Sequence, residues 1–227
     1  MVLNLVALGC ETSPSADESF TGGLPVDSGN SAGPSDIGFG TDDTLDVVTW
    51  NIEEFPKNGQ STAAAVVDIL QGLDADIVAL QEISDVASFE QMVDRMPGWR
   101  GYVDSGWYAG LAYLYRTDTI EVERNYEIYT TEEFWRPFPR SPQVMEFRFG
   151  DHDFVVINNH FKCCGDGFLD QDDPWDEETR RMDATDLLKT YIDTHFAHRS
   201  VIVLGDLNDS LTDTTQHNVF ASLLNDP

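Results

Sequence analysis

The sequence predicts one α/β domain with mixed β-sheets, preceded by a non-globular N-terminal stretch. Apolar runs rich in β-branched residues first alternate with helical segments, then follow one another closely, and then alternate again. The chain has 227 residues, of which 41% are hydrophobic, so it can build the core of one ordinary domain. The first 44 residues differ sharply in composition from the rest.

Residues 1–10, MVLNLVALGC, are typical of the end of a bacterial secretion signal. A short apolar run precedes Gly9 and Cys10, as at a lipoprotein cleavage site, where the cysteine becomes the lipidated first residue. The run lacks a basic beginning, so an ordinary N-terminus stays the alternative. We expect an exported protein, lipid-anchored to the bacterial cell envelope through Cys10 or extracellular.

Residues 11–44 predict a flexible acidic linker. Gly, Ser, Thr and Pro supply 19 of these 34 residues, and residues 1–44 contain seven acids and no Lys or Arg. Such a segment buries too little apolar surface to offset its ordering entropy. The globular domain is therefore expected at residues 45–227.

The first half of this domain alternates strands with helices. LDVVTWNI and DIVALQEI are short buried runs typical of strands, whereas the segments between and after them have helical spacing and a Ser/Thr cap or a Pro-Gly end. We expect strands at 45–52 and 76–83 and helices at 61–73 and 88–96.

The second half begins with strands that pair locally. Four strand-like runs follow one another, and the last two flank a Gly-Asp-His-Asp turn, which predicts a hairpin. A polar loop, a long amphipathic helix and a final buried strand follow. The expected strands are 110–116, 120–129, 143–150, 154–161 and 200–208, and the expected helix is 175–198.

The charge limits the classes of partner. Forty-one acids against thirteen bases give a formal net charge of −28, which repels polyanions at long range. Affinity driven by phosphate neutralisation is therefore not expected. No apolar run approaches the roughly 20 residues needed to span a bilayer.

The adjacent Cys163 and Cys164 allow several interpretations. A zinc site needs four ligands, and His160 with these two thiols supplies only three. A disulfide between neighbours needs an unusual peptide geometry. We interpret the pair as small apolar residues, with this disulfide or a bond to another chain as alternatives.

Four buried strands end in side chains suited to hard-cation phosphate chemistry. These are Asn51, Glu82, His160, and Asp206 with Asn208. Groups at strand ends converge on one rim of a layered α/β domain. Singly, Asn and Asp are ordinary turn formers, but a carboxylate ending the run DIVALQE is costly unless it is paired or metal-bound. Carboxylate and amide oxygens suit Mg²⁺, with Mn²⁺ or Ca²⁺ as alternatives.

The same residues carry a resemblance. TWNIEEF (49–55), ADIVALQEI (75–83), NNHFK (158–162) and GDLND (205–209) resemble, in order and spacing, the motifs of the endonuclease/exonuclease/phosphatase superfamily, which has the deoxyribonuclease I-like fold. The resemblance implies a four-layer α/β/β/α sandwich of two mixed sheets flanked by helices. It also implies a metal-dependent phosphoesterase, nuclease-like, that hydrolyses phosphodiester or phosphomonoester bonds with a metal-activated water.

The resemblance assigns a role to each matching residue. Glu82 would be the main metal ligand, with Asn51 beside it. Asp206 would orient or deprotonate the attacking water, Asn208 would hold the scissile phosphate, and His160 would donate a hydrogen bond to a phosphate oxygen. The expected partner is a phosphodiester substrate, either a nucleic acid or a phospholipid headgroup, and no protein partner is inferred.

The sequence departs from the family pattern near its end. The superfamily finishes with a strand bearing an Asp-His pair, and no such strand follows Asn208. We therefore expect a C-terminally truncated domain whose last strands are missing and whose turnover is slow or absent. A lipid or inositol-phosphate phosphodiesterase, such as a sphingomyelinase-like enzyme, and a non-catalytic tethered surface binding module are the alternative functions.

Two further features have plainer interpretations. The acids between Asp166 and Glu177 suggest Ca²⁺, but Phe168 and Gln171 occupy positions where a calcium loop needs a ligand and a glycine, which favours a solvated loop. Arg180 and Arg181 are expected to form surface ion pairs rather than to bind phosphate.

Overall fold

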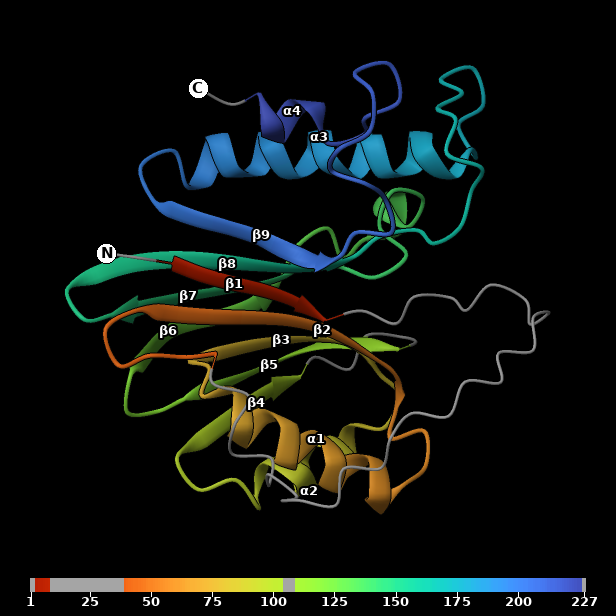
Figure 1. Ribbon diagram of the computed structural model, residues 1–227. Coiled ribbons are helices and arrows are strands. Elements are labelled where there is room, and N and C mark those ends of the chain that lie inside the picture. The colour runs from red at the N-terminus through yellow and green to blue at the C-terminus, as the bar shows by residue number, and fades with distance from the viewer. Residues whose placement is uncertain (1–2, 9–38, 104–108, 226–227) are drawn as a thin grey trace, which may run out of the picture.

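Two β-sheets lie face to face, and helices cover the outer face of each, in a computed structural model that describes residues 3–8, 39–103 and 109–225 (Figure 1). The order of layers is α/β/β/α, which confirms the four-layer sandwich. Cys10 and residues 11–38 of the expected linker lie outside the described residues.

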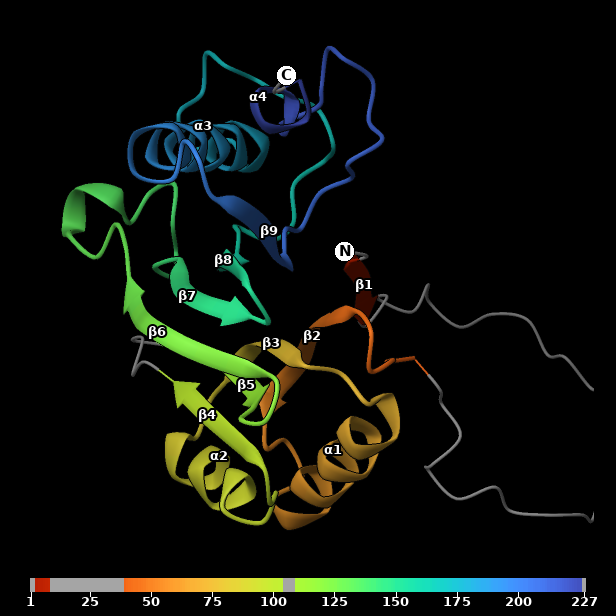
Figure 2. The ribbon, with the colours of Figure 1, turned by 90° about the vertical axis from the view of Figure 1, so that its left-hand side faces the viewer.

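The first sheet has the strand order β1-β2-β3-β5-β4. Strand β2 pairs in parallel with β1 and β3, whereas β5 is antiparallel to both β3 and β4. Helices α1 and α2 cover its outer face (Figure 2). The bounds are β1 (Leu3–Leu8), β2 (Leu45–Phe55), α1 (Gln60–Leu73), β3 (Ile77–Ile83), α2 (Val86–Val93), β4 (Trp99–Val103) and β5 (Gly110–Arg116).

The second sheet has the order β6-β7-β8-β9. The expected hairpin is present as β7 and β8, which turn at Gly150, and β9 then joins β8 in parallel. Helix α3 lies along the outer face with α4 beside it (Figure 1). The bounds are β6 (Ile120–Glu127), a 3₁₀ turn (Glu132–Phe134), β7 (Gln143–Phe149), β8 (His152–His160), α3 (Glu177–His195), β9 (Ser200–Asp206) and α4 (Ala221–Leu224). None of the described helices is long and apolar enough to cross a bilayer.

Two strands differ from the sequence expectation. Strand β4 was not predicted, because WRGYV contains a glycine and leaves its side chains partly or fully exposed. Residues Leu3–Leu8, which the sequence assigned to a secretion signal, pair with β2 from Leu45 to Trp50. Pairing of these residues does not test the signal assignment, which stays a prediction.

The core is stacked in three slabs that follow the two-residue period of the strands. Side chains such as Val48 pack between the first sheet and its helices, whereas the neighbouring Val47 packs between the sheets. Strand β8 divides in the same way, with Val156 between the sheets and Val155 under α3. Both sheets are thus buried on two faces over their central strands, which explains their continuous apolar runs.

A buried polar bridge joins the two sheets beside the site. The amide nitrogen of Gln81 in β3 donates to Asn158 Oδ1 in β8 at 2.7 Å. Asn158 Nδ2 in turn donates to the carbonyls of Leu80 and Ala112 at 3.0 and 3.2 Å. Asn158 is fully buried and Gln81 nearly so. The bridge therefore fixes the position of one sheet against the other, one residue before Glu82 and two before His160.

Candidate active site

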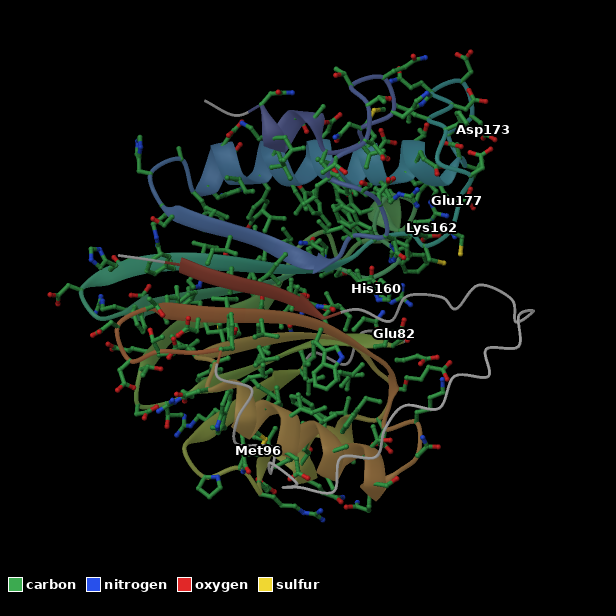
Figure 3. The ribbon with its side chains drawn as sticks, in the orientation of Figure 1. Glu82, Met96, His160, Lys162, Asp173 and Glu177 are labelled. Atoms are coloured by element: carbon green, nitrogen blue, oxygen red, sulfur yellow. The ribbon has the colours of Figure 1, made fainter. Side chains whose placement is uncertain are left out.

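The predicted site residues converge at one edge of the sandwich, between the two sheets. Glu82 and His160 lie close together there, although they come from different sheets (Figure 3). His160 ends β8 and is the register partner of Asp206, which ends β9. Asn51, within β2, is paired with the residue that precedes Glu82. The carboxyl ends of four strands thus meet at one place.

Asn51 holds two carboxylates with one amide group. Its Nδ2 donates to Glu82 Oε1 at 3.0 Å and to Asp206 Oδ2 at 2.8 Å. Its Oδ1 accepts a hydrogen bond from the backbone of Glu53 at 3.0 Å. Asn51 therefore fixes the spacing of the two acids, a role that sequence reasoning did not give it.

Glu82 occupies an unusual backbone conformation. Its φ is +67°, in the left-handed region that favours glycine, and Glu53 and Glu54 also have positive φ. The β2–β3 register shifts between Asn51 and Phe55, which lets the backbone N–H of Glu54 donate to Glu82 Oε2 at 3.1 Å. Irregular strands of this kind re-aim side chains at functional sites. Both oxygens of Glu82 are thereby held in place.

His160 faces both acids from the other sheet. It is 4% exposed, and its Nε2 lies 3.6 Å from Asp206 Oδ2 and 3.9 Å from Glu82 Oε1. Burial, aided by the positive charge of Arg140, lowers the pKa of His160 to about 4. The ring is therefore neutral at neutral pH. Its buried Nδ1 has no hydrogen-bond partner among the described residues.

The GDLND segment lies very close to the backbone at the end of β8. Gly205 has φ +134°, and a Cβ there would lie 2.0 Å from the carbonyl oxygen of Asn159, so only glycine fits. Asp206 Oδ1 accepts from the backbone of Asn208 at 3.2 Å, and Asn208 Nδ2 donates to the carbonyl of Phe161 at 3.2 Å. Asn208 is thus placed beside the acids, and its phosphate-holding role stays a prediction.

A buried charge cluster supports this segment from α3. The guanidinium of Arg181 donates to Asp209 Oδ2 at 2.7 Å and pairs with Glu178 Oε1 at 2.9 Å. It also donates to the carbonyls of Lys162 and Cys164 at 2.7 and 2.8 Å. The side chain is 2% exposed, so the expected surface pairing of Arg181 is wrong. Arg181 lies on the same face of α3 as the buried Leu188, and this helical spacing could have indicated that Arg181 is buried.

Arg140 is the second residue that sequence reasoning missed. Its positive charge lowers the pKa values of both His160 and Cys163, and its Nε donates to the carbonyl of Ala109 at 3.3 Å. It lies in the RPFPRSP stretch, which resembles the connection into the second half of the superfamily fold. The sequence around Arg140 does not indicate a role at the site, because the site residues on which it acts are distant in sequence.

The family profile described as Endonuclease/Exonuclease/phosphatase family matches residues 48–220. The chain belongs to this family. Its members are hydrolytic phosphoesterases, so the match supports phosphoester hydrolysis in general. No curated protein matches the chain.

Solved structures of this family share the fold. The D. rerio TDP2 structure complexed with a single-strand DNA product matches with TM-score 0.60 and 18% identity, over 80% of this chain and 64% of that one. The human nocturnin catalytic domain with bound sulfate matches with TM-score 0.61 and 16% identity, over 80% and 68%. A Bacteroides thetaiotaomicron family protein matches with TM-score 0.57 and 18% identity, over 79% and 68%. The chain thus spans about two thirds of the length of these structures.

The residues that the sequence resemblance assigns to the site fit a divalent cation. Glu82 and Asp206 carry two negative charges into a part-buried place where the partner they share is the neutral amide of Asn51. His160, which lies against both, is neutral. Carboxylate and amide oxygens are the donors that Mg²⁺ and Ca²⁺ prefer. Metal binding at this point would relieve the repulsion between the acids.

A second group of acids lies at the start of α3. Asp176, Glu177 and Glu178 are the only three carboxylates of the described residues whose oxygens lie within 4.8 Å of one another. Asp176 caps the helix by accepting from Thr179, and Glu178 accepts from the backbone of Gly167 at 2.7 Å. These contacts give the two acids a role in holding the polar loop against α3.

Proposed function

We propose that this protein hydrolyses phosphodiester bonds by means of a divalent cation, Mg²⁺ in the first place and Mn²⁺ or Ca²⁺ as alternatives. The observation that carries the proposal is the convergence of Glu82 and Asp206 on Asn51, with the neutral ring of His160 against both acids. Four strands from two sheets supply these groups. Family membership agrees with the general reaction class.

The cation would be held by Glu82 and by the side-chain oxygen of Asn51. The Asn51 amide now turns Nδ2 toward both acids and Oδ1 toward Glu53, so it would have to rotate to offer this oxygen. When bound, such an ion neutralises developing negative charge and lowers the pKa of a water molecule. Glu82 is already oriented for this role at Oε2, which accepts from the backbone N–H of Glu54.

The remaining residues act on the water and on the phosphate. Asp206 accepts a proton from the attacking water or orients it, as a general base must be fixed within hydrogen-bond reach. His160, neutral and buried, donates from Nε2–H to a phosphate oxygen and so stabilises the negative charge that develops there. Asn208, anchored to the Phe161 carbonyl, positions the phosphate for in-line attack.

We propose a nucleic acid as the first substrate class. The support is the D. rerio TDP2 structure, which contains a single-strand DNA product and has the same fold. The formal charge of −28 supports the alternative, a lipid or inositol-phosphate phosphodiesterase such as a sphingomyelinase-like enzyme. A small or membrane-bound substrate escapes the long-range repulsion that a polyanion meets.

The test is hydrolysis by the complete gene product with Mg²⁺ and with EDTA. The substrates are single- and double-stranded DNA, RNA, sphingomyelin and a phosphoinositide. We expect cleavage of one class with Mg²⁺ and none with EDTA. Glu90→Gln, which changes an exposed acid on α2 outside the site, should cleave equally well. Absence of hydrolysis of every substrate would overturn the enzyme proposal and leave the non-catalytic binding module.

We also propose that the protein is exported and tethered through Cys10. The support is the apolar run that ends in Gly9-Cys10 and the acidic segment after it. Expression in a bacterial host with labelled palmitate should give a labelled membrane-associated protein, and Cys10→Ser should remove the label. A labelled Cys10→Ser variant would contradict the tether.

A further inference from the structure

Two adjacent thiols lie at the surface just after the site strand β8. Cys163 and Cys164 are both free and exposed, and they follow His160 by three and four residues. Their sulfur atoms lie 2.9 Å apart, with the Cys164 thiol directed at Cys163 Sγ. Cys164 has φ +72°, a left-handed conformation that is rare for a residue with a side chain. The backbone is thus bent in a way that brings two neighbouring thiols together.

The segment that carries the thiols is fastened on both sides. The buried guanidinium of Arg181 binds the carbonyls of Lys162 and Cys164, and Glu178 binds the backbone of Gly167. The thiols are therefore held next to each other by the fold, and two reacting groups held in this way react with each other far faster than with free partners.

The surroundings of the two sulfur atoms differ. Lys162 Nζ lies 3.7 Å from Cys163 Sγ, and Arg140 adds a second positive charge. The Cys164 thiol, together with these cations, lowers the pKa of Cys163, whereas the neighbouring Cys163 raises the pKa of Cys164. One sulfur is thus the better attacking thiolate, and the other remains as a thiol that can resolve a mixed disulfide.

We propose that Cys163 and Cys164 form a thiol–disulfide modification site, which closes to an intramolecular disulfide by exchange with an external low-molecular-weight disulfide. This site is separate from the proposed phosphodiester chemistry. A soft-metal site is less well supported, because no His, Asp or Glu of the described chain joins the two thiols in a group of three close ligand atoms.

The exchange balances in two steps. The Cys163 thiolate attacks one sulfur of the external disulfide, the S–S bond breaks, and the first thiol leaves with a proton. The Cys164 thiolate then attacks Cys163 Sγ, the mixed disulfide breaks, and the second thiol leaves with the second proton. Two electrons pass from the two cysteines to the external disulfide, which is reduced to two thiols.

The closed form should be easily reversed. A ring that contains only two neighbouring residues departs from ordinary disulfide geometry, and strained or exposed disulfides are the labile ones. Ring closure also turns the peptide between Cys163 and Cys164. The carbonyl of this peptide, that of Cys163, accepts a hydrogen bond from Lys162 Nζ at 2.7 Å. Oxidation would thus break this contact of Lys162, two residues after His160, and leave its ion pair with Glu177.

The experiment uses the chain with Cys10→Ser, so that only the two thiols in question remain. The protein is incubated with oxidised glutathione, the remaining thiols are blocked, and the peptide that trypsin releases between Lys162 and Arg180 is weighed. We expect this peptide to lose the mass of two hydrogen atoms without a glutathione adduct, and dithiothreitol to restore it. A stable glutathione adduct, a disulfide-linked dimer or unreacted thiols would each overturn the proposal.

Single variants test the order of attack. Cys164→Ser should accumulate the glutathione adduct on Cys163, because the resolving thiol is absent. Cys163→Ser should react with glutathione more slowly, by roughly 10-fold, since Cys164 is the weaker nucleophile. Because these readouts involve no phosphodiester substrate, they can fail without affecting the proposed function, and the converse also holds. Equal rates for the two variants would contradict the roles given to the two sulfur atoms.

Discussion

Asp206 differs from Glu82 in the role that its surroundings support. Its two oxygens accept from Asn51 and from the backbone of Asn208, and it lies 3.6 Å from the neutral ring of His160. Glu82 is instead held by an amide and by the backbone of the irregular part of β2. These contacts therefore favour Asp206 as the group that acts on the water and Glu82 as the ligand of the cation in the proposed reaction.

Asp206→Asn should separate these roles. The amide keeps the shape but is no base, so we expect kcat to fall by about 10²- to 10⁴-fold. Mg²⁺ affinity should change only a few-fold, because Glu82 is intact. Steady-state kinetics at several Mg²⁺ concentrations measures both quantities. An equal loss of Mg²⁺ affinity and turnover would show instead that Asp206 is a principal metal ligand.

Helix α3 supports the site indirectly, through the buried side chain of Arg181. Arg181 is bound by Glu178 and Asp209, both almost fully buried, and by two carbonyls of the segment after β8. Removing one partner of such a cluster leaves charges buried without compensation. The cluster therefore joins α3, the segment after β8 and the GDLND loop into one unit.

Arg181→Met should lower the free energy of unfolding by about 3–5 kcal/mol, because Glu178 and Asp209 stay buried. Urea denaturation measures the change. Arg180→Met is the matched control on the same helix, since Arg180 is half-buried and donates only to the carbonyl of Arg136 among the contacts seen. Adding Glu178→Gln and Asp209→Asn to Arg181→Met should restore part of the stability. Equal losses for the two arginine variants would contradict a special role for the cluster.

Gly205→Ala tests the approach of β9 to β8. The new Cβ would overlap the Asn159 carbonyl, so the end of β9 must move and carry Asp206 with it. A displacement of about 1 Å can cost roughly 100-fold in rate. We expect a loss of that size in kcat together with a lower melting temperature. Gly150→Ala is the control, because Gly150 also has positive φ but a Cβ there meets nothing within 4 Å.

The two halves of the molecule are joined at the site by the bridge between Gln81 and Asn158. Each half supplies part of the chemistry, Glu82 and Asn51 from the first sheet and His160 and Asp206 from the second. The distance between these pairs depends on how the sheets pack. The bridge is therefore expected to matter for activity as well as for stability.

Asn158→Ala should remove the shortest hydrogen bond of the buried Gln81 amide, which keeps Thr49 and the Ala79 carbonyl as acceptors. It should also remove the side-chain donor to the carbonyls of Leu80 and Ala112. Each unsatisfied buried group costs about 1–3 kcal/mol, so the melting temperature should fall clearly. At a temperature where Asn158→Ala is still folded, kcat should fall. The Mg²⁺ affinity should be retained, because Glu82 and Asn51 both lie in the first sheet. A variant with lower stability but wild-type kcat would show that the bridge does not position the site.

Much of the fold and of the site could be predicted from the sequence, because both depend on local patterns. Buried strands appear as continuous apolar runs, and the chemical groups follow directly at their ends, as with Glu82 and Asp206. Contacts between residues that are distant in sequence leave no such local pattern. Arg181 meets Asp209 28 residues away, Arg140 acts on His160, and the exposed edge strand β4 has too little apolar character to be recognised.

The most direct test of the proposed metal site is calorimetric titration of Mg²⁺ or Mn²⁺ into the protein and into Glu82→Gln, with Glu90→Gln as the matched control. Gln has the shape of Glu but no charge, so circular dichroism should show the same fold in all three. We predict one cation site in the protein and in Glu90→Gln, and an affinity at least about 10-fold weaker in Glu82→Gln. Equal affinity in all three proteins, or no binding to the unmodified protein, would contradict the metal site on which the proposed function depends.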